Sequence, residues 1–251
     1  METLIVQLKG LYLCDMANKL SIRLQEAVAN ELSYVDFLQN LIDDELAGRQ
    51  DRLLNRRLKQ AQLPFHKTLE DFDFSFNPSI NKQHVKQLAA GAFIANHENV
   101  LVIGPPGVGK THLAVAFAIH AIHNGFSVLY RSIFDAAKDI AKKSELDVME
   151  LFLKPDLLII DELGMKKLSS YAMEIFLEVI HRRYLKRSTL IVTNRPIEDW
   201  GKILGDNATA AAVLDRFLEN MHFLKITGKS YRMKNLNNNN KKILDSHNTN
   251  S

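Results

Sequence analysis

Residues 100–117, VLVIGPPGVGKTHLAVAF, contain the most informative pattern in this chain. Residues 104–111, GPPGVGKT, match the pattern G-x-x-x-x-G-K-[ST] of a phosphate-binding loop. The apolar run 100–103 before the loop predicts a buried strand, and residues 113–122 after it predict a helix. Every fixed position of the pattern is filled in the expected strand–loop–helix context, which favours a nucleotide site over a glycine-rich turn without a ligand.

Each residue type in this loop has a physical role. Glycines let backbone N–H groups approach the phosphates, and the helix N-terminus adds partial positive charge. Lys110 is predicted to bind the β- and γ-phosphates of ATP, and Thr111 to bind Mg²⁺. The predicted nucleotide-binding residues here are Gly104, Pro105, Pro106, Gly107, Val108, Gly109, Lys110, Thr111 and His112.

Composition is typical of a globular protein with an ordinary core. Of the 251 residues, 46% are hydrophobic and 24% are charged, and the formal net charge is +3. Affinity for nucleic acid must therefore come from local basic clusters. The single cysteine, Cys14, excludes an internal disulfide. No apolar run approaches the roughly 18 residues of a membrane span and no signal peptide is recognisable, so we expect a cytoplasmic protein without membrane contact.

Three zones differ in their hydrophobic periodicity. Residues 1–65 predict a small all-helical domain, in which Ser33 and Asp36 form a capping box before a helix that runs to about Ala61. Residues 66–228 alternate strand and helix patterns, which predicts an α/β three-layer sandwich with a five-stranded parallel sheet. Residues 229–251 are a short segment and an asparagine-rich tail that we expect to be disordered.

The expected elements of the α/β zone follow the apolar runs. The predicted strands are 99–103, 126–131, 156–161, 188–193 and 222–227, and the predicted helices are 82–96, 109–123, 133–143, 168–185 and 207–220.

Asp161 and Glu162 follow a run of four apolar residues in LLIIDELG, residues 157–164. A carboxylate at the end of a buried strand, downstream of a phosphate-binding loop, is typical of a magnesium site, so Asp161 joins Thr111 as a predicted metal ligand. Glu162 is the predicted general base that polarises a water for attack on the γ-phosphate. The alternative for an acidic pair at a strand end is a helix cap, but the loop upstream favours catalysis.

Three further polar residues have more than one interpretation. Asn194 ends the predicted strand 188–193, where it either hydrogen-bonds the attacking water or the γ-phosphate, or stabilises a local turn. Arg216 and Arg232 are candidates for an arginine that reaches a γ-phosphate. Such an arginine, if supplied by a neighbouring subunit, would make hydrolysis depend on assembly. The alternative for Arg216 is a surface ion pair with Asp215, and spacing alone does not decide.

The chain resembles the IstB-like ATP-binding proteins, the ATPase helpers of insertion-sequence transposases, in GPPGVGKTHLA, LLIIDELG, TLIVTNRPIEDWGKILGD, AAVLDRFLE and ITGKSYRMK. Upstream stretches such as ELSYVDFLQNLIDDEL resemble the helical N-terminal region of the same family, so the resemblance covers residues 8–234. This family belongs to the AAA+ superfamily of P-loop NTPases and is similar to the helicase loader DnaC. The phosphate-binding loop is generic, whereas TNRPIEDWGKILGDNA through GKSYR is specific.

The resemblance implies an ATPase that uses ATP and Mg²⁺, with Glu162 as the catalytic carboxylate and Asn194 as the sensor on the fourth strand. It implies that Arg216 is an arginine finger acting on a neighbouring subunit, and that Arg232 is a second sensor contacting nucleotide in its own subunit. It also implies a homo-oligomer on double-stranded DNA and a transposase partner encoded by an adjacent gene. The C-terminal helical lid of the wider superfamily has no room here, so we expect a minimal or absent lid.

Basic residues gather in three clusters that are candidate contacts for DNA phosphates, the first also for the transposase. They are Arg49, Arg52, Arg56, Arg57 and Lys59, opposed only by Asp51; Lys166 and Lys167; and His181, Arg182, Arg183, Lys186 and Arg187. The alternatives are a favourable interaction with the helix macrodipole for the first cluster and a solvated basic face for the others. Phosphate contact predicts an affinity that falls steeply with salt and depends little on sequence.

The aromatic residues are more typical of a packed core than of a surface that stacks on nucleic-acid bases. Trp200 and the series Phe72, Phe74 and Phe76 are typical of a core, although the phenylalanines are also candidates for the wall of an adenine pocket.

The favoured function is an ATP-dependent DNA-binding helper of a transposase, active in transposition and target selection. The N-terminal zone favours it over a DnaC-like helicase loader, which shares the core motifs. A small-molecule phosphotransferase is the alternative from another class, and Glu162 beside the metal carboxylate argues for water as the acceptor instead. A nucleotide-gated binding module with negligible turnover is the third possibility.

Overall fold

The computed structural model describes residues 1–204 and 208–231 of the chain. The chain divides into two compact units, with the boundary between Arg57 and Leu58. The predicted asparagine-rich tail, the first residue of the predicted helix 207–220 and Arg232 lie outside the described residues. In the described part, no helix is both long enough and apolar enough to cross a membrane.

Three helices make up the first unit: α1 Glu2–Gly10, α2 Cys14–Ala29 and the greater part of α3 Tyr34–Ala61. The predicted capping box at the start of α3 is confirmed, because the Asp36 N–H donates to Ser33 Oγ at 3.2 Å and the Ser33 hydroxyl donates to the Asp36 carboxylate at 2.6 Å. The helix ends at Ala61 as predicted.

A buried carboxylate on α3 binds two cations of α2. Asp44 is buried and accepts hydrogen bonds from Lys19 Nζ and Arg23 Nε, each at 2.8 Å. The hydrogen bond from Arg23, followed by the one from Lys19, holds the pKa of Asp44 at about 2, below its ordinary value of 3.8. This network joins α2 to α3.

The neighbouring Glu45 caps α2 and changes the interpretation of the first basic cluster. Its buried carboxylate accepts the N–H of Asp15, in the first turn of α2, at 2.8 Å and Arg49 Nε at 2.8 Å. Arg52 donates to Asp15 and to Glu45. The expectation that only Asp51 opposes this cluster is therefore wrong for Arg49 and Arg52, which stabilise the first unit.

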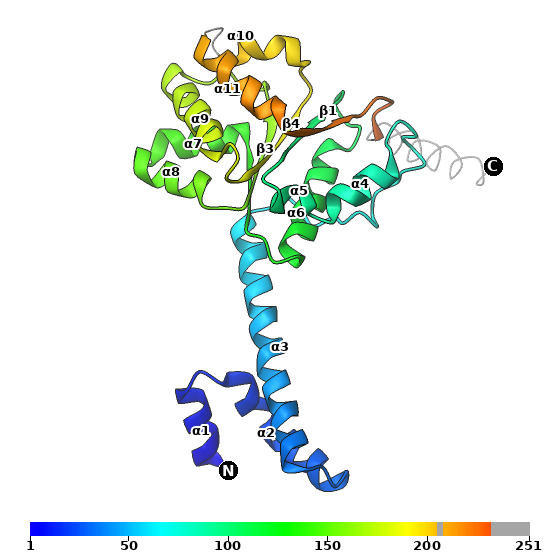
Figure 1. Cartoon of the computed structure of the whole chain (residues 1–251), viewed down its shortest axis with the longest axis vertical. Coiled ribbons are helices and arrows are strands. Elements are labelled where there is room, and N and C mark those ends of the chain that lie inside the picture. Colours follow the sequence, from blue (N-terminus) through cyan, green and yellow to red (C-terminus); the bar gives the residue numbers. More distant parts are fainter. Residues whose placement is uncertain (205–207, 232–251) are drawn as a thin grey trace, which may run out of the picture. The chain divides into compact units, whose positions relative to one another are not determined.

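The second unit is built on five parallel strands in the order β2-β3-β4-β1-β5 (Figure 1). Their bounds are β1 Asn99–Ile103, β2 Val128–Ser132, β3 Leu157–Leu163, β4 Ser188–Thr193 and β5 Met221–Lys225. The central strands β1, β3 and β4 consist almost wholly of buried residues, as expected for a sheet covered on both faces.

Helices cover both faces of this sheet (Figure 1). On one side α6 Lys110–His123 packs with α4 Lys82–Ala89, which leads to the short α5 Ala92–Ala95. On the other side a continuous apolar core joins the sheet to α7 Ile133–Lys142, α8 Glu145–Leu153, α9 Ser170–Arg183, α10 Trp200–Leu204 and α11 Ala208–Glu219, with the 3-10 turn Ile197–Asp199 before α10. This is the predicted α/β three-layer sandwich.

Three local features differ from the sequence prediction. The expected helix 82–96 is broken at Gly91, whose φ of +84° places it in the left-handed region. Helix α8 was not predicted, although Ser144 caps it by accepting the Asp147 N–H at 3.2 Å. Strand β3 continues beyond Asp161 to Leu163. Its register with β4 shifts after Ile160, and pairing resumes between Leu163 and Thr193.

Arg183 is the clearest correction to the third basic cluster. Its side chain is only 1% exposed, and it donates to the carbonyls of Phe152 at 2.8 Å and Pro155 at 2.9 Å, to three further carbonyls and to Thr189 Oγ1. These acceptors lie between the last turn of α8 and the start of β3, and at the start of β4. The expectation of an exposed basic residue is wrong here, because Arg183 connects the amino ends of two central strands.

The remaining arginines of that cluster are paired on the surface. Arg182 binds Glu178 at 2.5 Å one turn earlier in α9, and Arg187 binds Asp156. Arg182 is exposed, and an ion pair of such a residue contributes little to stability, whereas Arg187 and Asp156 are both half-buried.

We expect Arg183→Ala to lower the free energy of unfolding by at least about 3 kcal/mol, because several buried carbonyls lose their donor at about 1–3 kcal/mol each. Urea unfolding measures the loss. Arg182→Ala is the matched control, since the adjacent arginine has only an exposed partner, and it should change stability little. A loss of similar size in both variants would contradict the structural role of Arg183.

We expect the contribution of Asp44 to stability to depend on pH. Because its pKa is depressed in the folded state, the stabilisation is fully present above pH ~4 and is lost as the pH falls toward about 2. Asp44→Asn should therefore be less stable than the parent chain at pH 6 and nearly equal to it near pH 2. Thermal unfolding of the two proteins tests this, with Asp43→Asn, on the exposed side of the same helix, as the control whose effect should not vary in this way.

Candidate nucleotide-binding site

Strand β4 lies between β1 and β3 and brings three predicted site segments to one edge of the sheet. Thr193, the last residue of β4, pairs with Ile103 of β1 and with Leu163 of β3. The Gly104 N–H donates to the Thr193 carbonyl at 3.3 Å, and the Thr193 hydroxyl donates to the Leu163 carbonyl at 2.7 Å. The phosphate-binding loop, the pair Asp161–Glu162 and Asn194 therefore start from adjacent strand ends.

The loop leads directly into α6, as predicted. Gly109 is the N-cap residue with a φ of +99°, and Lys110 is the first helical residue. Lys110 Nζ donates to the Pro105 carbonyl at 2.8 Å, which folds the lysine back across the loop. The first N–H groups of an α-helix have no partner within the helix, so a helix N-terminus at this position suits an anion.

The segment after β5 packs against the same loop. The Tyr231 N–H donates to the Gly107 carbonyl at 2.9 Å. A Cβ on Gly104 would lie 2.3 Å from the Ile226 carbonyl oxygen, so only glycine permits this close approach. Arg232 is the next residue and lies outside the described part, so its predicted contact with nucleotide and the expected minimal or absent lid both stay predictions.

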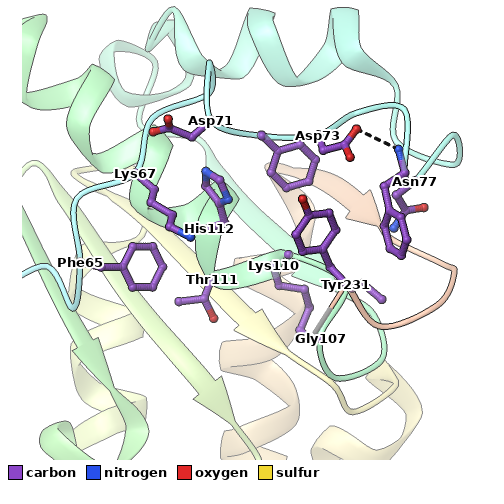
Figure 2. A pocket seen from close by; sticks show the side chains of 14 residues that line it. Phe65, Lys67, Asp71, Asp73, Asn77, Gly107, Lys110, Thr111, His112 and Tyr231 are labelled. Atoms are coloured by element: carbon purple, nitrogen blue, oxygen red, sulfur yellow. Dashed lines mark hydrogen bonds between the residues drawn. The ribbon is translucent and has the colours of Figure 1, made fainter. Parts of the chain in front are cut away.

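A cavity of about 330 Å³ opens beside the loop. Figure 2 shows side chains converging on it from the segment 65–77, from the start of α6 and from Tyr231. It is lined by Phe65, Lys67, Asp71, Phe72, Asp73, Phe76, Asn77, Gly107, Val108, Gly109, Lys110, Thr111, His112 and Tyr231. An apolar and aromatic wall next to a phosphate-binding loop fits a nucleotide base and sugar.

Aromatic contacts shape this wall. The Phe72 and His112 ring centroids lie 5.1 Å apart, and those of Phe76 and Tyr231 lie 4.9 Å apart. His112 Nε2 also contacts the Thr68 carbonyl at 2.8 Å, and this contact joins α6 to the segment 65–77. Tyr231 is a lining residue that our sequence analysis missed.

Phe74 and Trp200 lie outside this cavity. Phe74 packs against Phe72, with Lys82 over its ring, and Trp200 is completely buried against Phe217. The predicted packing role is confirmed for Trp200.

Asp161 is held by two donors at the end of β3. Its carboxylate is 2% exposed; Oδ1 accepts the Glu162 N–H at 2.7 Å, and Oδ2 accepts the Tyr130 hydroxyl at 2.8 Å. Glu162 has a φ of +62°, an unfavourable conformation for a residue with a side chain, and its own side chain is exposed. Burial and the nearby Asp161 carboxylate raise the pKa of Tyr130, so its hydroxyl remains a donor at neutral pH.

Asn194 combines a contact with an unsatisfied atom. Its Nδ2 donates to Met165 Sδ at 3.3 Å, whereas its Oδ1 is buried and has no hydrogen-bond partner among the described residues. A buried amide oxygen without a donor is costly, and a water bound beside a nucleotide supplies such a donor.

The donor set fits a nucleotide-bound Mg²⁺. The Thr111 hydroxyl and the Asp161 carboxylate are both oxygen ligands, and Mg²⁺ in such sites takes one or two protein ligands together with phosphate oxygens and waters. In the described residues no three His, Cys, Asp or Glu side chains gather into a metal-binding group, and this two-ligand arrangement requires none.

Arg216 lies at the other end of the sheet. It is exposed near the end of α11, and its Nη1 contacts Nδ1 of His181, in the last turn of α9, at 2.7 Å. Strand β5 begins two residues after α11 ends, so this pair lies toward the edge where the strands begin, away from its own phosphate-binding loop. The side-chain contact of Arg216 is thus with His181, and not with Asp215, the partner in the alternative interpretation.

Comparison with known proteins shows which family this chain resembles. The family described as IstB-like ATP binding protein matches residues 6–239. The ATP-binding protein of insertion sequence IS21 from Pseudomonas aeruginosa is 38% identical over 238 residues, which cover 93% of this chain and 89% of that protein. The corresponding protein of IS5376 from Geobacillus stearothermophilus is 34% identical, over 89% of this chain and 91% of its own length.

Solved structures share the fold at lower identity. DnaI is similar with a TM-score of 0.53 and 20% identity, over 66% of this chain and 90% of its own. AMPPCP-bound DnaA from Aquifex aeolicus has a TM-score of 0.53 and 19% identity, over 72% of this chain and 56% of its own. The fold is that of the AAA+ P-loop ATPases, and the chain belongs to the family of IstB-like ATP-binding proteins.

Proposed function

We propose that this protein hydrolyses ATP with Mg²⁺ in a homo-oligomer assembled on double-stranded DNA and so assists a transposase encoded by an adjacent gene. The observation that carries the proposal is the meeting of the phosphate-binding loop, Asp161–Glu162 and Asn194 at one sheet edge. Membership of a family whose relatives are ATP-binding proteins of insertion sequences supports the transposition context.

Each residue at this edge has a distinct task in the proposed reaction. Lys110 and the loop N–H groups bind the phosphates. Thr111 and Asp161 would hold Mg²⁺, which supplies charge neutralisation on the phosphate oxygens. Glu162 accepts a proton from the attacking water, and the unsatisfied Asn194 Oδ1 accepts a hydrogen bond that orients this water.

The position of Arg216 supports catalysis across a subunit interface. Because it lies toward the sheet edge opposite its own phosphate-binding loop, we propose that it reaches the γ-phosphate of a neighbouring protomer. An arginine at that point neutralises charge that develops in the transition state and contributes roughly 1,000- to 100,000-fold in turnover. Hydrolysis then requires assembly. Arg232 remains our proposal for a second sensor within the same protomer.

Lys166 and Lys167 are the preferred candidates for DNA contact. Both line a cavity of about 510 Å³ together with Lys202, and Lys166 lies over the Phe134 ring with its Nζ 5.9 Å from the centroid. These three cations outnumber Glu174, the one carboxylate among the described lining residues, and so suit phosphate groups, with an affinity that falls steeply as salt rises.

A helicase loader is the closest alternative, and the relatives favour transposition. The similarity to DnaI is one of fold at 20% identity, whereas the IS21 protein of Pseudomonas aeruginosa aligns at 38% identity over 93% of this chain. A small-molecule phosphotransferase is less consistent with the exposed Glu162 beside the metal carboxylate.

Phosphate release measured with and without duplex DNA separates these functions. We expect Mg²⁺-dependent release of phosphate that duplex DNA stimulates. ADP formed only after addition of a small metabolite would identify a phosphotransferase instead, and nucleotide binding without turnover would identify a binding module.

We expect Arg216→Ala to bind ATP normally and to lose at least about 1,000-fold in turnover. Lys110→Ala should lose ATP binding, yet its Arg216 can serve a neighbour. Mixing the two inactive variants should therefore restore part of the activity, since mixed oligomers place an intact Arg216 beside an intact phosphate-binding loop. Arg182→Ala is the control for loss of a nearby surface charge. Absence of recovery on mixing, with mixed oligomers demonstrated, would contradict action in trans.

We expect Phe72→Ala to weaken ATP binding about 10-fold, since an aromatic contact of about 1.4 kcal/mol corresponds to that factor. Fluorescence titration with a nucleotide analogue measures the change, and inorganic triphosphate, which lacks a base, should bind both proteins alike. Phe134→Ala, an exposed phenylalanine outside the cavity, is the control. Equal ATP affinity in all three proteins would exclude Phe72 from the base site.

A further inference from the structure

Tyr130 donates a hydrogen bond from its buried hydroxyl to the Asp161 carboxylate. It belongs to β2, its side chain is 7% exposed, and its hydroxyl donates to Asp161 Oδ2 at 2.8 Å. No motif of the phosphate-binding loop or of the acidic pair includes this residue.

Sheet register explains why a tyrosine reaches Asp161. Ser132 pairs directly with Asp161, and Tyr130 pairs with Ile159, two residues earlier. Residues two apart in a strand share a face, so Tyr130 and Asp161 are diagonal neighbours on the same face of β2 and β3. A diagonal neighbour on a sheet lies farther away than a directly paired residue, so a long aromatic side chain at position 130 reaches Asp161 where a short one would not.

The two donors at Asp161 together define its orientation. Oδ1 accepts the Glu162 N–H at 2.7 Å, and Oδ2 accepts the Tyr130 hydroxyl. A carboxylate bound at one oxygen rotates about the Cβ–Cγ bond, whereas one bound at both is fixed. Each oxygen keeps a second lone pair that these donors do not use.

The chemical type of the donor matters as much as its place. A lysine or arginine at position 130 would pair with the carboxylate and reduce its attraction for a dication. A phenol is neutral and donates one hydrogen bond, so it orients Asp161 without cancelling its charge.

We propose that Tyr130 is a positioning residue for Asp161, whose carboxylate its buried hydroxyl fixes in the orientation needed to hold the Mg²⁺ of a bound nucleotide. This inference rests on the proposed function, which assigns Asp161 to the metal. Groups that orient metal ligands typically contribute 10- to 100-fold in metal affinity or activity.

The test is the Mg²⁺ dependence of nucleotide binding in Tyr130→Phe. Phenylalanine keeps the ring and its packing and removes only the hydroxyl. A fluorescent, non-hydrolysable ATP analogue is titrated at increasing Mg²⁺ and, separately, in EDTA. We expect the Mg²⁺ concentration at half-maximal effect to rise roughly 10- to 100-fold. Binding in EDTA should stay unchanged, which shows in the same sample that the variant is folded.

Two further variants distinguish the possible outcomes. Tyr184→Phe removes another tyrosine–carboxylate hydrogen bond, to Glu219 at 2.5 Å, and should leave the Mg²⁺ dependence unaltered. Asp161→Asn should abolish it. An unchanged dependence in Tyr130→Phe while Asp161→Asn alters it would overturn the role of Tyr130 alone. An unchanged dependence in both would overturn the metal role of Asp161, and the inference with it.

Discussion

The site depends on the position of strand β4 between β1 and β3. The phosphate-binding loop, the acidic pair and Asn194 are far apart in the sequence, and each lies near or just after the carboxyl end of a different strand. Parallel pairing at Thr193 brings the three strand ends together, and its hydroxyl and carbonyl connect them by hydrogen bonds to Leu163 and Gly104. The catalytic geometry that we propose is therefore a property of strand order before it is a property of any side chain.

The two edges of the sheet handle buried charge in opposite ways. At the carboxyl edge, Asp161 is satisfied by the neutral donors Tyr130 O–H and Glu162 N–H, which preserve its negative charge. At the amino edge, the cation of Arg183 is satisfied by backbone carbonyls and so connects strand starts. The first arrangement leaves a charge able to attract a metal ion, whereas the second uses a charge to stabilise the fold.

Local patterns predicted the elements, and tertiary contacts decided the roles of several residues. The loop, the strands and the long α3 follow from spacing and capping, which the sequence shows directly. The roles of Tyr130 and Arg183 could not be predicted in this way, because their partners depend on strand register and on the packing of α9. Helix α8 was predictable in principle, since Ser144 and Asp147 have the spacing of a cap. The extension of β3 past Asp161 was not, because it depends on pairing with Thr193.

In our proposal hydrolysis and assembly on DNA are coupled, because one protomer supplies the phosphate-binding loop and another supplies Arg216. Turnover per protomer, measured over a wide range of protein concentration with and without duplex DNA, tests this coupling. We expect negligible turnover for dilute monomer and a cooperative rise with concentration, shifted to lower concentration by duplex DNA. Constant turnover per protomer in a preparation that stays monomeric, unaffected by DNA, would contradict it.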